Sequence, residues 1–203
     1  IGLTKFKIEG RADVEKLTSL PVVGDIPLAD EKTGSIAVFE NQNNLMSETF
    51  RNVRTNLQFM LENGKNVILV TSTISGEGKS FISANLAISL SLLGKKVVIV
   101  GLDIRKPGLN KVFNIPKKEH GITQYLTNTT ANLMDFVQPS DINKNLFILP
   151  GGTVPPNPTE LLARGGLEKA IETLKANFDY VILDRAPVGM VTDTLLIGRV
   201  ADL

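Results

Sequence analysis

The sequence predicts a doubly wound, mostly parallel α/β sheet with helices on both faces, and three observations lead to this fold class. Short and nearly continuous runs of Val, Ile and Leu recur along the chain, and such runs are typical of strands covered on both faces. Segments with helical spacing of apolar residues lie between them, which favours parallel strand order. At 203 residues, 42% of them hydrophobic, the chain is long enough to bury one core.

The elements follow in order from the N-terminus. Residues 1–40 alternate short apolar runs with turn residues, which indicates an extended lead-in segment, and residues 41–203 are expected to form the folded domain. Apolar residues at helical spacing and glycine stop signals predict helices, whereas Val- and Ile-rich runs predict strands. The expected helices are 44–63, 81–93, 122–126 and 159–178, and the expected strands are 67–72, 95–103, 145–150 and 179–184.

Composition excludes several classes of function. The chain has 22 basic and 21 acidic residues, so its charge gives no general reason to bind nucleic acid or an anionic membrane. It has no cysteine and one histidine, His120, which excludes a disulfide framework, a cysteine metal site and a histidine-based metal site. No apolar run approaches the ~18 residues of a spanning helix. The chain begins at Ile1 and stops at Leu203 inside an apolar run, and we expect a cytosolic piece of a longer protein.

The stretch VILVTSTISGEGKS (67–80) predicts a strand that runs into a phosphate-binding loop. Gly76 and Gly78 would let backbone N–H groups close around phosphate oxygens. Lys79 would reach the β- and γ-phosphates, and the Ser80 hydroxyl would bind Mg²⁺. The general pattern has glycine where this chain has Thr73, and the alternative is a glycine turn with a surface lysine. The expected nucleotide contacts are Ser75, Gly76, Glu77, Gly78, Lys79, Ser80 and Phe81.

Two aspartates end predicted strands and are candidates for the metal side of such a site. Asp184 ends DYVILD and would be the Walker-B carboxylate, while Asp103 ends VVIVGLD. Ligands of parallel α/β sheets bind at the carboxyl ends of strands, and carboxylates suit Mg²⁺. Ser80, Asp103 and Asp184 are therefore the expected metal ligands, and Lys79, Asp103 and Asp184 the expected catalytic residues. The alternative for each aspartate is a helix cap or a turn residue.

Four stretches together resemble one known family. They are ISGEGKS (74–80), GLDIRKPGL (101–109), LPGGTVPPNPTELL (149–162) and LDRAPVGMVTDT (183–194). In them, and in most of the chain from about Pro21 onward, the sequence is similar to the cytoplasmic kinase domain of bacterial tyrosine kinases (BY-kinases), the partners of polysaccharide co-polymerases in capsule and exopolysaccharide synthesis. The resemblance implies a P-loop fold, ATP with Mg²⁺, and autokinase transfer of the γ-phosphoryl group to tyrosine. It also implies a cytoplasmic domain attached to a transmembrane co-polymerase region, in the same chain or in a partner, at the inner membrane.

Glu48, Arg51 and Arg54 form a further motif, E-x-x-R-x-x-R, within SETFRNVR. The spacing of three residues places them on one helix face, which by itself favours an ordinary solvated face. The motif resembles the ring-assembly motif of the BY-kinases, and this resemblance implies a homo-oligomer with these residues at the subunit interface.

Several departures from related patterns leave alternatives open. Ile74 stands where partitioning and septum-positioning ATPases carry a signature lysine, which disfavours an ATPase switch. Gly101 replaces the first aspartate of the family's D-x-D strand end, and Arg185 follows Asp184, where we expect it to face away from the metal. Because of these two residues, a second hypothesis remains: an ATP-binding assembly module with little phosphoryl transfer. The resemblance implies a tyrosine-rich C-terminal tail that neighbouring subunits phosphorylate, and we expect residues 1–203 to lack it. The two tyrosines present, Tyr125 and Tyr180, are expected to be packing residues rather than phosphate acceptors.

Overall fold

The computed structural model describes residues 7–30, 34–61, 64, 66–116, 120–128, 130–163, 165–187 and 201–203. Its sheet has the strand order β1-β5-β2-β4-β3. The strands are β1 (Val67–Val70), β2 (Val97–Gly101), β3 (Gln138–Pro139), β4 (Leu146–Leu149) and β5 (Tyr180–Asp184). All pairs among β1, β5, β2 and β4 are parallel, and only the two-residue β3 runs antiparallel, at the edge beside β4. The predicted fold class is confirmed.

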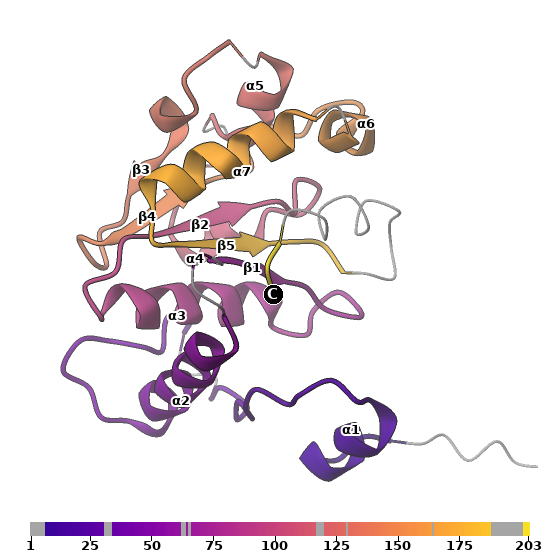
Figure 1. Ribbon diagram of the computed structural model, residues 1–203, viewed down its shortest axis with the longest axis vertical. Helices are drawn as coiled ribbons and strands as arrows, with labels where there is room; N and C mark the ends of the chain where they lie inside the picture. Colours follow the sequence, from indigo (N-terminus) through magenta and orange to yellow (C-terminus); the bar gives the residue numbers. More distant parts are fainter. Residues whose placement is uncertain are drawn as a thin grey trace, which may run out of the picture.

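Helices cover both faces of this sheet, as Figure 1 shows. They are α1 (Arg11–Leu17), α2 (Leu45–Met60), α3 (Lys79–Ser91), α4 (Gly108–Val112), α5 (Ile122–Thr127), the 3-10 helix η1 (Leu133–Phe136), α6 (Pro158–Ala163) and α7 (Gly166–Asn177). Helix α7 lies on one face and α3 on the other, with α2 on the outer side of α3. The short elements α1, α4, η1 and β3 were not predicted, because each has too few residues to show a period.

Two apolar clusters lie on the two faces of the sheet. One joins the odd-numbered residues of β5, Val181 and Leu183, which share one face of the strand, to α5, α6 and α7. The other joins Ile182 to α2, α3 and α4 and includes Ala37 and Val38 from the chain before α2. This alternation along β5 decides which face each C-terminal strand residue presents.

Helix α3 is buried on nearly all sides and carries, besides Lys79, four buried uncharged polar residues: Ser83, Asn85, Ser89 and Ser91. The Asn85 side chain accepts hydrogen bonds from the backbone N–H groups of Ala37 (2.8 Å) and Val38 (3.1 Å). Its amide donates to the carbonyl groups of Ser35 (3.1 Å) and Phe81 (2.8 Å). The end of the lead-in segment is thus fixed to α3, while a domain boundary at residue 40 remains a prediction.

The helix predicted over 159–178 is divided into α6 and α7. Gly165 has a φ of +75°, a left-handed conformation that glycine adopts without strain, and α7 begins at the next residue. At the outer edge of β1, the N–H of Leu69 donates to the carbonyl of Leu203 at 2.7 Å. Among the described residues, no helix has both the length and the apolar character needed to cross a bilayer.

Candidate active site

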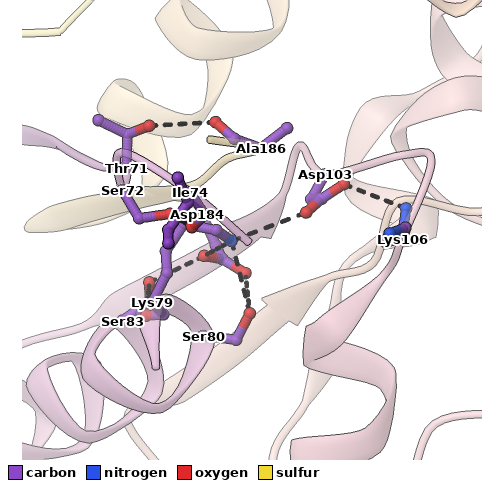
Figure 2. Close-up of polar contacts among 10 residues, drawn as sticks. All are labelled: Thr71, Ser72, Ile74, Lys79, Ser80, Ser83, Asp103, Lys106, Asp184 and Ala186. Atoms are coloured by element: carbon purple, nitrogen blue, oxygen red, sulfur yellow. Dashed lines mark hydrogen bonds and ion pairs between the residues drawn. The ribbon is translucent and has the colours of Figure 1, made fainter. Parts of the chain in front are cut away.

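The loop between β1 and α3 adopts the backbone conformation that its glycines were expected to provide. Gly76 and Gly78 have φ angles of +94° and +83°, which side-chain-bearing residues rarely adopt. Helix α3 begins directly after Gly78, at Lys79, so its positive N-terminal end faces the loop. The side chains of Lys79 and Ser80 point from this helix toward the end of β5 (Figure 2).

Thr73, which replaces the usual glycine at the start of the loop, forms a clamp with Glu77. The Glu77 carboxylate accepts hydrogen bonds from the Thr73 hydroxyl (2.8 Å) and from the backbone N–H groups of Thr73 (2.9 Å) and Ile74 (3.2 Å). The Thr73 hydrogen bond, followed by that of Ile74, lowers the pKa of the exposed Glu77 carboxyl. The departure from the glycine pattern therefore has a structural compensation, because the added hydroxyl helps to hold the loop closed.

The Asp184 carboxylate, at the end of β5, is the centre of the site and is 1% exposed. Its Oδ1 accepts from Lys79 Nζ at 2.7 Å and lies 3.0 Å from the Ser83 hydroxyl. Its Oδ2 accepts from the Ser80 hydroxyl at 2.9 Å. Figure 2 shows these three side chains reaching Asp184 from one face of α3. Sequence reasoning found Lys79, Ser80 and Asp184 but missed Ser83, although its position four residues after Lys79 places it on the same helix face.

Asp103 lies beside this cluster, just beyond the end of β2. Its Oδ2 is 3.9 Å from Lys79 Nζ, and its Oδ1 accepts from the backbone N–H of Lys106 at 3.1 Å. The backbone N–H groups of Leu102 and Asp103 both donate to the Asp184 carbonyl, which fixes the spacing of the two aspartates. Burial raises the pKa of the Asp103 carboxyl; the Lys106 N–H and Lys79 oppose this change, and Asp184 adds to it.

Two glycines shape the wall of the site. Gly101 pairs in register with Asp184, and a Cβ there would lie 3.1 Å from the backbone nitrogen of Gly151. The loop after β4 therefore lies against Gly101, where the D-x-D pattern would place its first aspartate. A Cβ on Gly108 would lie 2.4 Å from Ser80 Oγ. The start of α4 therefore packs closely against the hydroxyl that is expected to bind metal.

Replacing Gly108 with alanine is expected to weaken Mg-ATP binding at least about tenfold, because the added methyl must displace Ser80 from its place beside Asp184. Isothermal titration measures the change. Gly10→Ala is the matched control, since no atom lies within 4 Å of a Cβ at Gly10. Equal affinities for the two variants would contradict the role given to the Gly108–Ser80 contact.

Arg185, the residue after Asp184, is buried at 1% exposure. Its backbone N–H donates to the Val70 carbonyl at 3.1 Å, which continues the parallel pairing beyond Asp184. Successive strand residues point to opposite faces of a sheet, so alternation would put Arg185 on the same face as Leu183 and opposite to Asp184. The expectation that Arg185 faces away from the metal remains a prediction, whereas its burial was not predicted. The segment 188–194 of the motif LDRAPVGMVTDT lies outside the described residues.

The other predicted residues lie apart from the Asp184 cluster. The Phe81 ring packs edge-on against Phe50, with 6.1 Å between the ring centroids, and its contact with a nucleotide stays a prediction. Tyr125 is 2% exposed, and the partly buried Tyr180 hydroxyl accepts a hydrogen bond from Gln58 at 3.3 Å. Tyr125 is a packing residue, as predicted, whereas Tyr180 is only partly buried, so its role stays a prediction.

The motif on α2 divides into two parts. Glu48 and Arg51 form an exposed ion pair at 2.5 Å. Arg54 turns toward α3, where Nη1 donates to the Ser89 carbonyl at 2.7 Å. Burial, and then the charge of Arg51, lower the pKa of the Arg54 guanidinium. Arg54 therefore holds α2 against α3, and Glu48 and Arg51 are the members presented to solvent.

The residues around Asp184 fit a magnesium nucleotide. No cluster of three or more His, Cys, Asp or Glu side chains that could hold a metal occurs among the described residues. Mg²⁺ does not require one, because it keeps several waters and binds one or two carboxylates together with substrate phosphates. Asp184 with the Ser80 hydroxyl, and Asp103 nearby, supply such a set, and Lys79 supplies a cation for phosphate oxygens.

The comparison with known proteins agrees with this geometry. The AAA domain family matches residues 65–200. Over 155 residues, the chain is 37% identical to the tyrosine-protein kinase CpsD of Streptococcus agalactiae and 38% identical to CpsD of Streptococcus pneumoniae. These alignments cover 76% of this chain and 66% and 67% of the two proteins. The chain belongs to the bacterial tyrosine kinase family.

Solved structures of similar proteins support the same family and fold. The chimerical protein CapA2B2 superposes with a TM-score of 0.84 at 35% identity, covering 94% of this chain and 81% of that one. The septum site-determining protein MinD of Pyrococcus horikoshii, complexed with Mg-ADP, superposes with a TM-score of 0.57 at 25% identity, covering 68% and 55%. The chain spans about two thirds of the length of its S. agalactiae relative.

Proposed function

We propose that this BY-kinase domain binds Mg-ATP between the phosphate loop and Asp184 and transfers the γ-phosphoryl group to tyrosine. The observation that carries the proposal is the meeting of Lys79, Ser80 and Asp184, with Asp103 beside them, at the carboxyl edge of the sheet. In the whole protein the activity would be that of an autokinase regulating capsule or exopolysaccharide synthesis and export. The domain would act at the cytoplasmic side of the inner membrane, with a transmembrane co-polymerase region of its own chain or of a partner.

Each residue of the cluster has a separate task in this proposal. The backbone N–H groups of the loop and the Lys79 ammonium hold the β- and γ-phosphates. Ser80 and Asp184 would hold the cation, and Mg²⁺ bound there would neutralise negative charge on the phosphate oxygens. Asp103 accepts the proton of the tyrosine hydroxyl as the tyrosine oxygen bonds to the γ-phosphorus and the bond to the leaving ADP oxygen breaks. The raised pKa of Asp103 suits a proton acceptor better than an ordinary surface carboxyl.

The acceptor tyrosine is not one of the two in this sequence. Tyr125 is buried in the core, and the Tyr180 hydroxyl is engaged with Gln58. A substrate tyrosine would therefore come from another part of the whole protein, from a neighbouring subunit or from another protein. A synthetic tyrosine-rich peptide is the appropriate acceptor in a first assay.

One observation favours the alternative of an assembly module that binds ATP and turns over little. Gly101 at the strand end carries no carboxylate, and a Cβ there would make a tight contact of 3.1 Å with the backbone nitrogen of Gly151. The two functions are separated with ATP labelled in the γ-phosphate. Transfer of label to the peptide supports the kinase, release of free phosphate alone supports an ATPase switch, and binding with neither supports the assembly module.

Asp184→Asn is expected to weaken the binding of Mg-ATP more strongly than the binding of metal-free ATP. The substitution removes the charge expected to hold the cation but keeps a side-chain oxygen that can accept from Lys79. Titrations with MgCl₂ and with EDTA measure the two affinities. Equal losses in both conditions would show that Asp184 does not act through the metal.

We also propose that Glu48 and Arg51 lie at a subunit interface of a homo-oligomeric ring. Both side chains are 47% exposed, whereas Arg54 contributes within the subunit by binding Ser89. Replacing only the exposed pair tests the interface without loosening α2.

Glu48→Ala with Arg51→Ala is expected to shift an assembled protein to monomers in sedimentation velocity, with Mg-ATP binding retained. Arg11→Ala with Glu15→Ala is the matched control, because that pair is equally exposed and also lies within one helix. If the sedimentation profile changes as little as that of the control, the Glu48–Arg51 pair is not at a subunit interface. It is then an ordinary solvent-exposed ion pair, which contributes little to stability.

A further inference from the structure

Ser83 has a hydroxyl that two acceptors compete for. The residue is fully buried in α3, one turn after Lys79. Its Oγ lies 2.9 Å from the Lys79 carbonyl oxygen and 3.0 Å from Asp184 Oδ1. A serine hydroxyl has one hydrogen to donate, so it satisfies one of these oxygens at a time.

Lys79 decides which acceptor needs that hydrogen. In the structure Lys79 Nζ donates to the same oxygen, Asp184 Oδ1, at 2.7 Å. With this cation in place, the Ser83 hydrogen is available for the Lys79 carbonyl, the usual back-bond of a serine within a helix. A Lys79 ammonium that turns to a phosphate withdraws its hydrogen bond from Oδ1. With Lys79 in place, Asp184 is 1% exposed, and a buried carboxylate oxygen left without a donor is costly.

We propose that Ser83 is a positioning residue of the nucleotide site, whose hydroxyl turns from the Lys79 carbonyl to Asp184 Oδ1 when Lys79 engages phosphate. This hydrogen bond would keep Oδ1 satisfied and leave Oδ2 to Ser80 and to the cation that these two residues would hold. The inference rests on the proposed function, since it concerns the same nucleotide site. It assigns to Ser83 an energetic role that appears on nucleotide binding, rather than a constant contribution to the fold.

Ser83→Ala, compared with Ser91→Ala, tests this role. Ser91 is also fully buried in α3 and its hydroxyl also donates to a helix carbonyl, that of Ile88 at 2.7 Å, but it lies about 12 Å further along the helix axis. Ser83→Ala is expected to weaken Mg-ATP binding about tenfold, the size of effect typical of a hydrogen bond to a charged group. In urea titrations without nucleotide it should unfold like the wild type, because Lys79 still donates to Oδ1. Ser91→Ala should keep its Mg-ATP affinity.

A double-mutant cycle shows whether the effect passes through Asp184. In an Asp184→Asn background, where the charged oxygen is gone, Ser83→Ala is expected to cost little further affinity. Ser83→Cys fills the site of the hydroxyl with a thiol, which is a weak hydrogen-bond donor. It should lose as much Mg-ATP affinity as Ser83→Ala, which would show that the loss does not come from an unfilled space in the core.

Three results would overturn the inference: wild-type affinity in Ser83→Ala, an affinity loss matched by Ser91→Ala, or an equal loss in the Asp184→Asn background. Failure of the unmodified chain to bind Mg-ATP is a different result, and it would remove the proposed function together with this inference.

Discussion

Lys79→Met is expected to reduce phosphoryl transfer by at least about a hundredfold and also to destabilise the fold. The first effect follows because the phosphates lose a positioned charge contact, and one such contact is typically worth a factor of about 10²–10³ in rate. The second follows because Lys79 pairs with Asp184 where both side chains are buried, at 8% and 1% exposure. Removing one partner of a buried pair costs roughly 3–5 kcal/mol of unfolding free energy. Labelled-phosphate transfer and urea unfolding measure the two effects.

The combination of Lys79→Met with Asp184→Asn separates these two losses. Neutralising the stranded carboxylate should recover most of the unfolding free energy, since no uncompensated charge remains buried, while transfer stays absent. A Lys79→Met protein as stable as the wild type would mean that the ion pair makes no net contribution to the fold. Undiminished transfer in that variant would mean that the nucleotide site lies elsewhere.

Asp103→Asn is expected to lower the rate of transfer by about 10²–10⁴, the usual contribution of a general base, with little change in Mg-ATP affinity. The geometry favours this division of roles, because Ser80 hydrogen-bonds to Asp184, whereas Asp103 lies 3.9 Å from Lys79 and binds the Lys106 N–H. Single-turnover transfer and isothermal titration measure the two quantities. A loss of Mg-ATP affinity as large as that of Asp184→Asn would instead make Asp103 a metal ligand.

The same variant has an expected effect on stability. Burial raises the pKa of Asp103 in the folded protein, so the native state holds this proton more tightly than the unfolded state. Stability without nucleotide therefore falls as the pH rises from the ordinary aspartate pKa through the raised one. Asparagine carries no charge and keeps an acceptor for Lys106. Asp103→Asn should unfold at a higher urea concentration at neutral pH than the wild type, and this advantage should disappear under acidic conditions. An unchanged midpoint across that range would contradict the cost assigned to the charge.

The sequence was sufficient for the features that depend on local pattern. The Val- and Ile-rich runs located β1, β2, β4 and β5, and placing Asp103 and Asp184 at strand ends was enough to bring them to one edge, because parallel strands end together. The glycines of the loop were recognisable since their positive φ angles are required by the turn. Helix α3 was predicted within two residues at either end despite its buried polar residues.

Other features depend on contacts that no local pattern encodes. Arg54 shares a helix face with Glu48 and Arg51, yet it binds a carbonyl of α3, which becomes visible only when the two helices pack. The helix break at Gly165 depended on one φ angle within a pair of adjacent glycines. Thr73 departs from the glycine of the loop pattern, and only the structure shows that its hydroxyl donates a hydrogen bond to Glu77. Ser83 was on the correct face of α3, but a serine four residues after a lysine is too common to identify a site.

The attachment of residues 35–38 to Asn85 has a mechanical consequence. A pull applied to the N-terminal segment would reach α2 through the hydrogen bond from Asn56 to the Val23 carbonyl and α3 through the Asn85 amide. Asn85 lies six residues along α3 from Lys79, so tension on the segment and closure of the loop around phosphate would act on the same helix. Asn85→Ala would remove the side-chain connection between residues 35–38 and α3 without altering Lys79, Ser80 or Asp184.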